Sequence, residues 1–75
     1  MTIRIFGPLE DITGTPALNI EGIGDTLQLR HHLEESYPDL QNRKFVIAVD
    51  NRVVNGSIEL NENSEVALLP PFSGG

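Results

Sequence analysis

The sequence predicts an α+β fold in which a mixed sheet of four to five strands packs on one main helix. Short runs of alternating or continuous apolar residues, typical of strands, occur toward both ends of the chain. A segment between them carries apolar residues at steps of four, which is typical of a helix. The 75 residues are enough for one small domain.

Two strands are expected near the start of the chain. Residues 2–5 alternate polar and apolar side chains, as a half-buried strand does, and residues 17–20 repeat the pattern. Gly7-Pro8 ends the first run, because proline cannot donate a hydrogen bond to a strand ladder. We expect an antiparallel hairpin with a long loop. The side chains expected to face the core are Ile3, Ile5, Leu18 and Ile20.

One helix is expected over residues 25–36. Asp25 is an N-cap candidate, and Gln28 stands three residues later, where a capping box places its second side chain. Pro38 ends the helix, because the residue before a proline avoids helical backbone angles. The apolar face consists of Leu29, Leu33 and Tyr37, with Leu27 at its edge.

Three strands are expected in the second half of the chain, over residues 45–49, 52–54 and 65–69. The first is continuously apolar, which indicates a central strand buried on both faces. Asp50-Asn51 is a turn candidate between the first two. The order β-β-α-β-β-β matches the β-grasp roll of ubiquitin, with residues 1–69 forming the domain.

Composition excludes several classes of function. Eleven acidic and five basic residues give a net charge of −6, so neither nucleic acid nor an anionic membrane is an expected partner. A partner with a basic face fits better. The absence of cysteine excludes disulfides, thiolate metal sites and a cysteine nucleophile. No apolar run approaches the ~18 residues of a membrane span, and no signal peptide is recognised, so a cytoplasmic location is expected.

Two candidate sites within the domain are weak. Gly22-Ile23-Gly24 precedes the helix and half-resembles a dinucleotide fingerprint, but the third glycine is missing. The glycines are better explained by a tight turn into the helix. His31 and His32 are adjacent and therefore point about 100° apart on a helix, so they cannot hold one metal ion together. No metal site is expected.

The C-terminal segment, residues 70–75, carries the strongest functional signal. Pro70-Pro71 is stiff and extended, and Phe72 is a large apolar anchor beyond the last strand. Ser73-Gly74-Gly75 has almost no side-chain bulk, so its carboxylate can pass down a narrow channel. We expect an extended, flexible tail that inserts into a partner. The plain alternative is a frayed terminus.

Residues 65–75, Glu-Val-Ala-Leu-Leu-Pro-Pro-Phe-Ser-Gly-Gly, resemble the tail of the small subunit of molybdopterin synthase. These subunits are ubiquitin-like sulfur carriers of the MoaD/ThiS-like family, and every element of their tail is matched here. The length and element order also agree. Two positions depart from the family pattern. Leu9-Glu10-Asp11 stands where the family has an arginine followed by a glutamate, and Asp50 stands where it has an asparagine.

The resemblance implies a sulfur carrier that is not an enzyme on its own. A ubiquitin-activating-like adenylyltransferase would use ATP to adenylate the carboxylate of Gly75, and sulfur would displace AMP to leave a thiocarboxylate. The large subunit of molybdopterin synthase would supply the catalytic side chains that direct the sulfur to cyclic pyranopterin monophosphate. No cofactor or metal is expected on the chain itself. The residues expected to insert into that subunit are Pro70, Pro71, Phe72, Ser73 and Gly74.

Other functions of the same tail remain open. The chain could carry sulfur for another product, such as the thiazole of thiamine or an amino acid, although the thiazole members of the family usually lack the Pro-Pro pair. A ubiquitin-like modifier would instead join Gly75 to lysines of other proteins. A non-covalent binding domain with an inert tail would not need Gly74 and Gly75.

Overall fold

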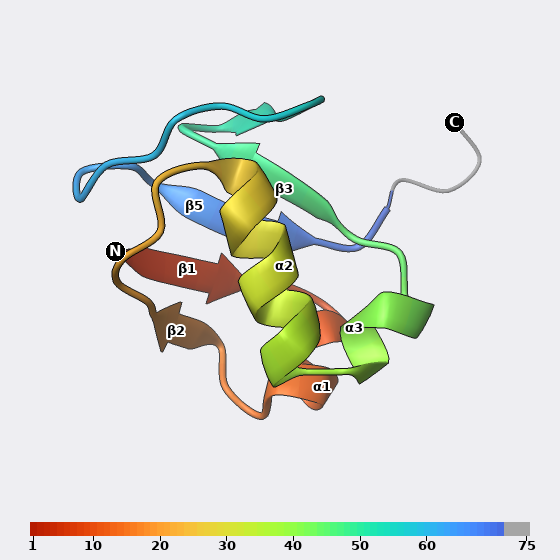
Figure 1. Ribbon diagram of the computed structural model, residues 1–75. Helices are drawn as coiled ribbons and strands as arrows, with labels where there is room; N and C mark the ends of the chain where they lie inside the picture. Colours follow the sequence, from red (N-terminus) through yellow and green to blue (C-terminus); the bar gives the residue numbers. More distant parts are fainter. Residues whose placement is uncertain (72–75) are drawn as a thin grey trace.

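The computed structural model describes residues 1–71 and contains five strands and three helices in that range (Figure 1). In chain order these are β1 (Thr2–Ile5), α1 (Leu9–Thr13), β2 (Ala17–Asn19), α2 (Thr26–Ser36), α3 (Asp39–Asn42), β3 (Val46–Val49), β4 (Arg52–Val53) and β5 (Val66–Leu69). Each expected strand and the expected main helix are present. No helix within these residues is long and apolar enough to cross a membrane.

The five strands form one mixed sheet in the order β2-β1-β5-β3-β4. β1 pairs antiparallel with β2, as the predicted hairpin requires, and parallel with β5. β3 pairs antiparallel with both β4 and β5. The β-grasp arrangement is therefore confirmed. The prediction that residues 45–49 form a central strand is confirmed, because β3 lies between β5 and β4 and three of its four residues are buried. The middle position of the sheet belongs to β5.

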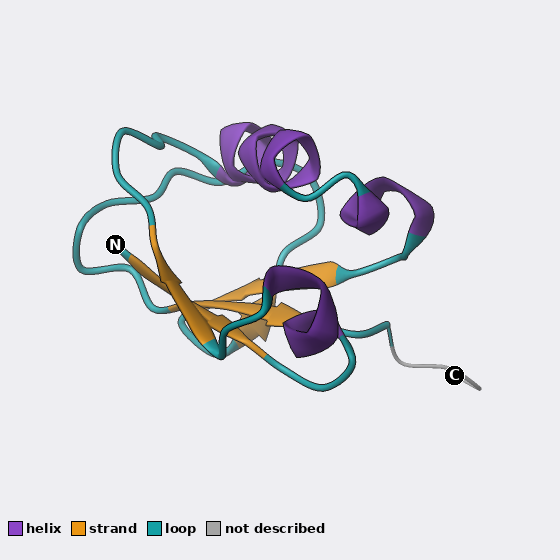
Figure 2. Ribbon diagram, turned by 90° about the horizontal axis from the view of Figure 1, so that it is seen from below, coloured by secondary structure: helices purple, strands orange, loops and turns teal. Residues whose placement is uncertain are grey.

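Figure 2 shows α2 and α3 on one face of the sheet and no helix on the opposite face, while α1 lies in front of the sheet at its end. The covered face carries the core, in which Ile47 and Val49 of β3 are buried. Ala48 points to the opposite face, because successive side chains of a strand alternate. It is only 6% exposed although no helix covers it, since neighbouring strands shield so small a side chain. The core also contains Ile3, Ile5, Leu29, Leu33, Leu40 and Leu68.

The start of α2 follows the predicted capping pattern with one difference. The Asp25 carboxylate accepts a hydrogen bond from the backbone N–H of Gln28 at 2.8 Å. The Gln28 side-chain oxygen accepts from the N–H of Gly24 at 2.9 Å, one residue earlier than the usual capping box requires. The helix ends at Ser36, ahead of Pro38 as expected.

A second short helix, α3, was not predicted. It has only four residues and begins after Pro38, so it contains too few turns to show an apolar period. Its one buried residue, Leu40, adds to the core.

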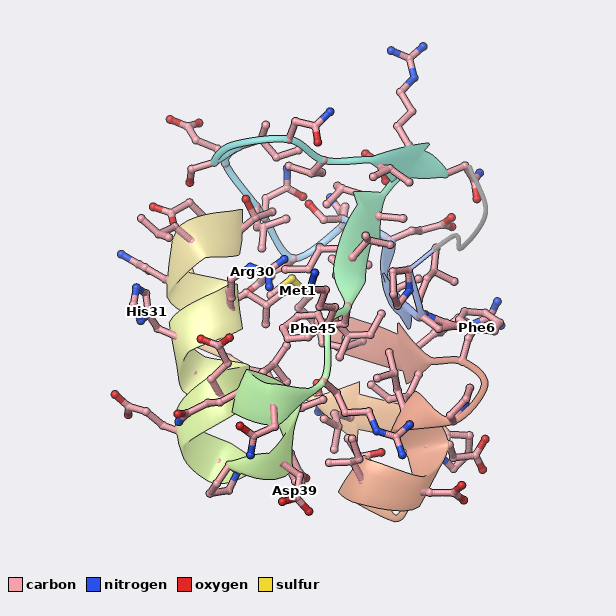
Figure 3. The ribbon with its side chains drawn as sticks, turned by 90° about the vertical axis from the view of Figure 1, so that its right-hand side faces the viewer. Met1, Phe6, Arg30, His31, Asp39 and Phe45 are labelled. Carbon is pink, nitrogen blue, oxygen red and sulfur yellow. The ribbon has the colours of Figure 1, made fainter. Side chains whose placement is uncertain are left out.

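The side chain of Arg30 links α2 to the segment before β3. Its guanidinium lies 4.3 Å from the centre of the Phe45 ring and donates to the Phe45 carbonyl at 3.3 Å (Figure 3). These contacts fasten α2 to the start of β3.

Candidate functional site

The end of β5 is held on both sides by neighbouring strands. On one side Leu68 lies opposite Ile5 of β1, and on the other Leu69 lies opposite Val46 of β3. The N–H of Phe6 extends the first ladder by donating to the Leu68 carbonyl at 3.0 Å. Because β5 is the central strand, the chain leaves the sheet from its middle, at the end where α1 and α3 lie (Figure 1).

The predicted C-terminal segment falls only partly within the described residues. Pro70 is half-buried against Gly7, and Pro71 is exposed. Phe72, Ser73, Gly74 and the reacting Gly75 lie outside the described residues. Their insertion into a partner and the chemistry at Gly75 remain predictions from the sequence.

The uncovered face of the sheet, next to the end of β5, presents an apolar surface. It contains a shallow hollow of about 330 Å³, and its exposed apolar side chains include Phe6 (42% exposed) and Val53 (45%). Figure 3 places Phe6 on the opposite side of the molecule from His31 of α2. We call this surface the open sheet face and define it by Arg4, Phe6, Ala48, Val53, Ala67 and Leu69.

Sequence reasoning did not identify which residues form the open sheet face, although a signal was present. In a sheet covered on one side, the outward residues of each strand are usually polar. β1 follows this rule with Arg4, whereas β5 places Ala67 and Leu69 at its outward positions. Apolar residues at these outward positions of the central strand make the open sheet face a candidate docking surface.

The two departures from the family pattern have different structural consequences. Glu10 and Asp11 are exposed in the first turn of α1, close to the Gly7 turn, so they change the charge of the surface without touching the core. Asp50 instead supports the β3–β4 turn at a φ of +50°. Its Oδ1 accepts from the N–H of Glu65 at 3.1 Å, and its own N–H donates to the Glu65 carbonyl at 2.8 Å. An asparagine side chain has an oxygen that accepts the same bond.

The weaker candidates show no additional chemistry in the described residues. His31 and His32 are exposed on α2. Residues 1–71 contain no group of three histidine, aspartate or glutamate side chains that could hold a metal ion. Gly22 has a φ of +79°, as a tight turn requires, and the Gly24 N–H takes part in capping α2. The glycines of this segment therefore shape the start of the helix.

Comparison with known proteins places this geometry in a family. The sequence matches the ThiS family over residues 3–75, a range that includes the whole C-terminal segment. The chain belongs to the ThiS family. This match confirms the family that the C-terminal segment suggested, the ubiquitin-like sulfur carriers of the ThiS/MoaD kind.

Two solved structures share the fold of this ThiS-family chain. SAMP1 from Haloferax volcanii superposes with a TM-score of 0.75 at 19% identity, covering 99% of this chain and 97% of that one. The second belongs to the protein–protein complex of subunits 1 and 2 of molybdopterin-converting factor from Helicobacter pylori 26695. Its TM-score is 0.73 at 26% identity, with 99% of this chain and 96% of that chain covered.

Proposed function

We propose that this chain is the sulfur-donating small subunit of molybdopterin synthase. The observation that carries the proposal is the match to the ThiS family through Gly75, combined with the Pro70-Pro71 pair directly after the last strand. The similarity to a chain from a complex of molybdopterin-converting factor subunits supports the choice of pathway. In this role the large subunit would be the partner and would provide the catalytic side chains.

The chemistry requires activation of the Gly75 carboxylate, because a carboxylate is a poor electrophile. A carboxylate oxygen attacks the α-phosphorus of ATP on the adenylyltransferase, and pyrophosphate leaves. A sulfur nucleophile then attacks the carbonyl carbon, AMP leaves, and a thiocarboxylate remains at Gly75. Its sulfur attacks a carbon of cyclic pyranopterin monophosphate on the large subunit and displaces an oxygen group. Water then hydrolyses the resulting thioester, which leaves the sulfur on the pterin and regenerates the Gly75 carboxylate. The chain itself supplies the reacting terminus and the surface that positions it.

The structure supports this role through the distance between surface and terminus. Gly75 is the fifth residue after Pro70, and a fully extended stretch of five residues spans at most about 18 Å. A partner that binds the open sheet face beside the end of β5 therefore has the carboxylate within reach. Apolar surface next to a reactive terminus suits both an activating enzyme and a large subunit.

The first step can be tested by intact-mass measurement. The untagged chain is incubated with ATP, a sulfur source and the adenylyltransferase of its host, and we expect one oxygen at Gly75 to be replaced by sulfur. A chain lacking Gly74 and Gly75 is the negative control. An unchanged mass with an adenylyltransferase that is active on another carrier would overturn the proposal.

The second step separates the proposed pathway from its alternatives. The thiocarboxylated chain is mixed with the large subunit and cyclic pyranopterin monophosphate, and we expect molybdopterin to form. Sulfur loading without turnover of the pterin would favour a carrier for thiazole or amino acid synthesis. Isopeptide adducts between Gly75 and lysines of other proteins would favour a protein modifier.

A further inference from the structure

The turn after β1 forms a surface against which Pro70 rests. Gly7 has a φ of +61°, and a Cβ atom built on it would lie 3.4 Å from Pro70 Cγ and 3.7 Å from Pro70 Cδ. The proline ring therefore lies beside the turn, close enough that a side chain at position 7 would contact it. Pro70 is half-buried, whereas Pro71 is exposed, so Pro70 is the last residue of the described chain that packs on the domain.

This turn is held in place by bonds on both of its sides. The N–H of Phe6 donates to the Leu68 carbonyl of β5 at 3.0 Å, and the Gly7 carbonyl accepts from the N–H of Glu10 at 3.1 Å. Leu9, which follows in α1, is only 1% exposed and anchors that helix in the core. The turn is thus tied to both the central strand and α1, and it offers the Pro70 ring a fixed support.

We propose that Gly7 is a positioning residue that seats Pro70 and thereby fixes the direction in which the C-terminal segment leaves the sheet. This inference rests on the proposed function, in which Gly75 must reach the reacting centre of a partner. The ring of Pro70 already fixes its own φ near −65°. With the ring seated, the point and the direction in which the chain leaves the sheet at Pro71 are set. Fixing this starting point before binding lowers the cost of placing the carboxylate.

Backbone conformation alone offers a simpler reason for a glycine at position 7, since positive φ disfavours most side chains. The chain contains a matched control for this explanation. Gly14 has a φ of +74°, but no heavy atom lies within 4 Å of the corresponding Cβ position. Asparagine tolerates positive φ better than most residues. Gly7→Asn and Gly14→Asn therefore make the same backbone demand, and only Gly7→Asn places a side chain against Pro70.

The kinetic test measures thiocarboxylate formation by wild type, Gly7→Asn, Gly14→Asn, Pro70→Ala and the double variant Gly7→Asn/Pro70→Ala. We expect Gly7→Asn to lower kcat about tenfold with little change in KM, because the docking surface is intact and only the tail is misplaced. Gly14→Asn should stay within about twofold of wild type. Pro70→Ala removes the ring that packs beside Gly7, so a side chain at position 7 no longer has a ring to displace. The double variant should therefore be no slower than Pro70→Ala alone. Thermal unfolding of each variant verifies that it is folded.

Two results would overturn the proposal: equal kinetics of Gly7→Asn and Gly14→Asn, or a double variant whose loss is the product of the two single losses. A second measurement needs no partner. In NMR spectra of the free wild-type chain we expect a nuclear Overhauser effect between Gly7 Hα and the Pro70 ring protons. Absence of this effect would refute the packing of Pro70 beside Gly7, whatever the rate of thiocarboxylate formation. If the effect is present but the wild-type chain cannot form the thiocarboxylate, the proposed function is refuted and the packing of Pro70 beside Gly7 is retained.

Discussion

At the scale of single residues, Asp50 shows how one side chain joins two distant parts of the chain. Replacing Asp50 with alanine removes the acceptor for the Glu65 N–H. It also places at positive φ an alanine, whose side chain cannot form the local hydrogen bonds that help aspartate adopt this conformation. We expect Asp50→Ala to lower the free energy of unfolding by about 1–2 kcal/mol. Asp50→Asn keeps an acceptor oxygen and should stay within about 0.5 kcal/mol of wild type. Urea unfolding of both variants provides the measurement. Equal losses would show that the side-chain bond is unimportant.

A second residue-scale prediction concerns Phe72. This aromatic side chain follows the last strand, and large aromatic groups are frequent hot spots when they fill a pocket of a partner. We expect Phe72→Ala to weaken binding to the large subunit at least about tenfold. The melting temperature should change little. Calorimetric titration and thermal unfolding together test this, and a large drop in melting temperature with unchanged affinity would contradict the prediction.

At the scale of elements, the two faces of the molecule should respond differently to loss of an apolar side chain. Phe6 on the open sheet face and Leu27 on α2 are 42% and 53% exposed, so neither is part of the core. We expect Phe6→Ala to weaken binding of the adenylyltransferase about tenfold, because Phe6 lies beside the end of β5. Leu27→Ala is the control and should change that affinity less than about twofold. The comparison requires only dissociation constants for the two variants, and equal effects would rule out the open sheet face as the docking surface.

Element by element, sequence patterns were most informative where the structure depends on nearby residues. The β1–β2 hairpin, the cap at Asp25, the end of α2 before Pro38 and the turn at Asp50-Asn51 were all predicted. The helix α3 was missed, because four residues contain too little periodicity. The interior position of β3 was predicted from its continuous apolar run, which indicates burial. The same pattern does not say which strand occupies the middle of the sheet, and that strand is β5.

At the scale of the whole molecule, the two chain ends should differ in their tolerance of added residues. The Met1 amine lies near Asn19 Oδ1, 3.4 Å away, on the far side of the molecule from the end of β5 (Figure 1). We expect one residue appended after Gly75 to abolish sulfur loading, because the free carboxylate is the group that is adenylated. A short extension before Met1 should leave loading intact. Intact-mass measurement of both extended chains tests whether each one acquires sulfur. Sulfur loading of a chain that keeps its C-terminal extension would refute the mechanism.

Sequence alone was sufficient to predict the five strands, the main helix, the α+β class and the family. It also pointed to the C-terminal segment, where small and stiff residues directly suggest a reactive terminus. These features depend on periodicity, caps, turns and residue types, all of which can be recognised within a few neighbouring positions.

Three features emerge only from the folded chain, namely the sheet order, the open sheet face and the proximity of Pro70 to Gly7. Each of these depends on the parallel pairing of β1 with β5, which joins the two ends of the chain. Local patterns carry no information about such a pairing. It is selected by burial of the whole core against one face of the sheet, where Ile3, Ile5, Val66 and Leu68 all belong to one apolar cluster. Once that packing is made, the Gly7 turn and the start of the C-terminal segment necessarily lie side by side.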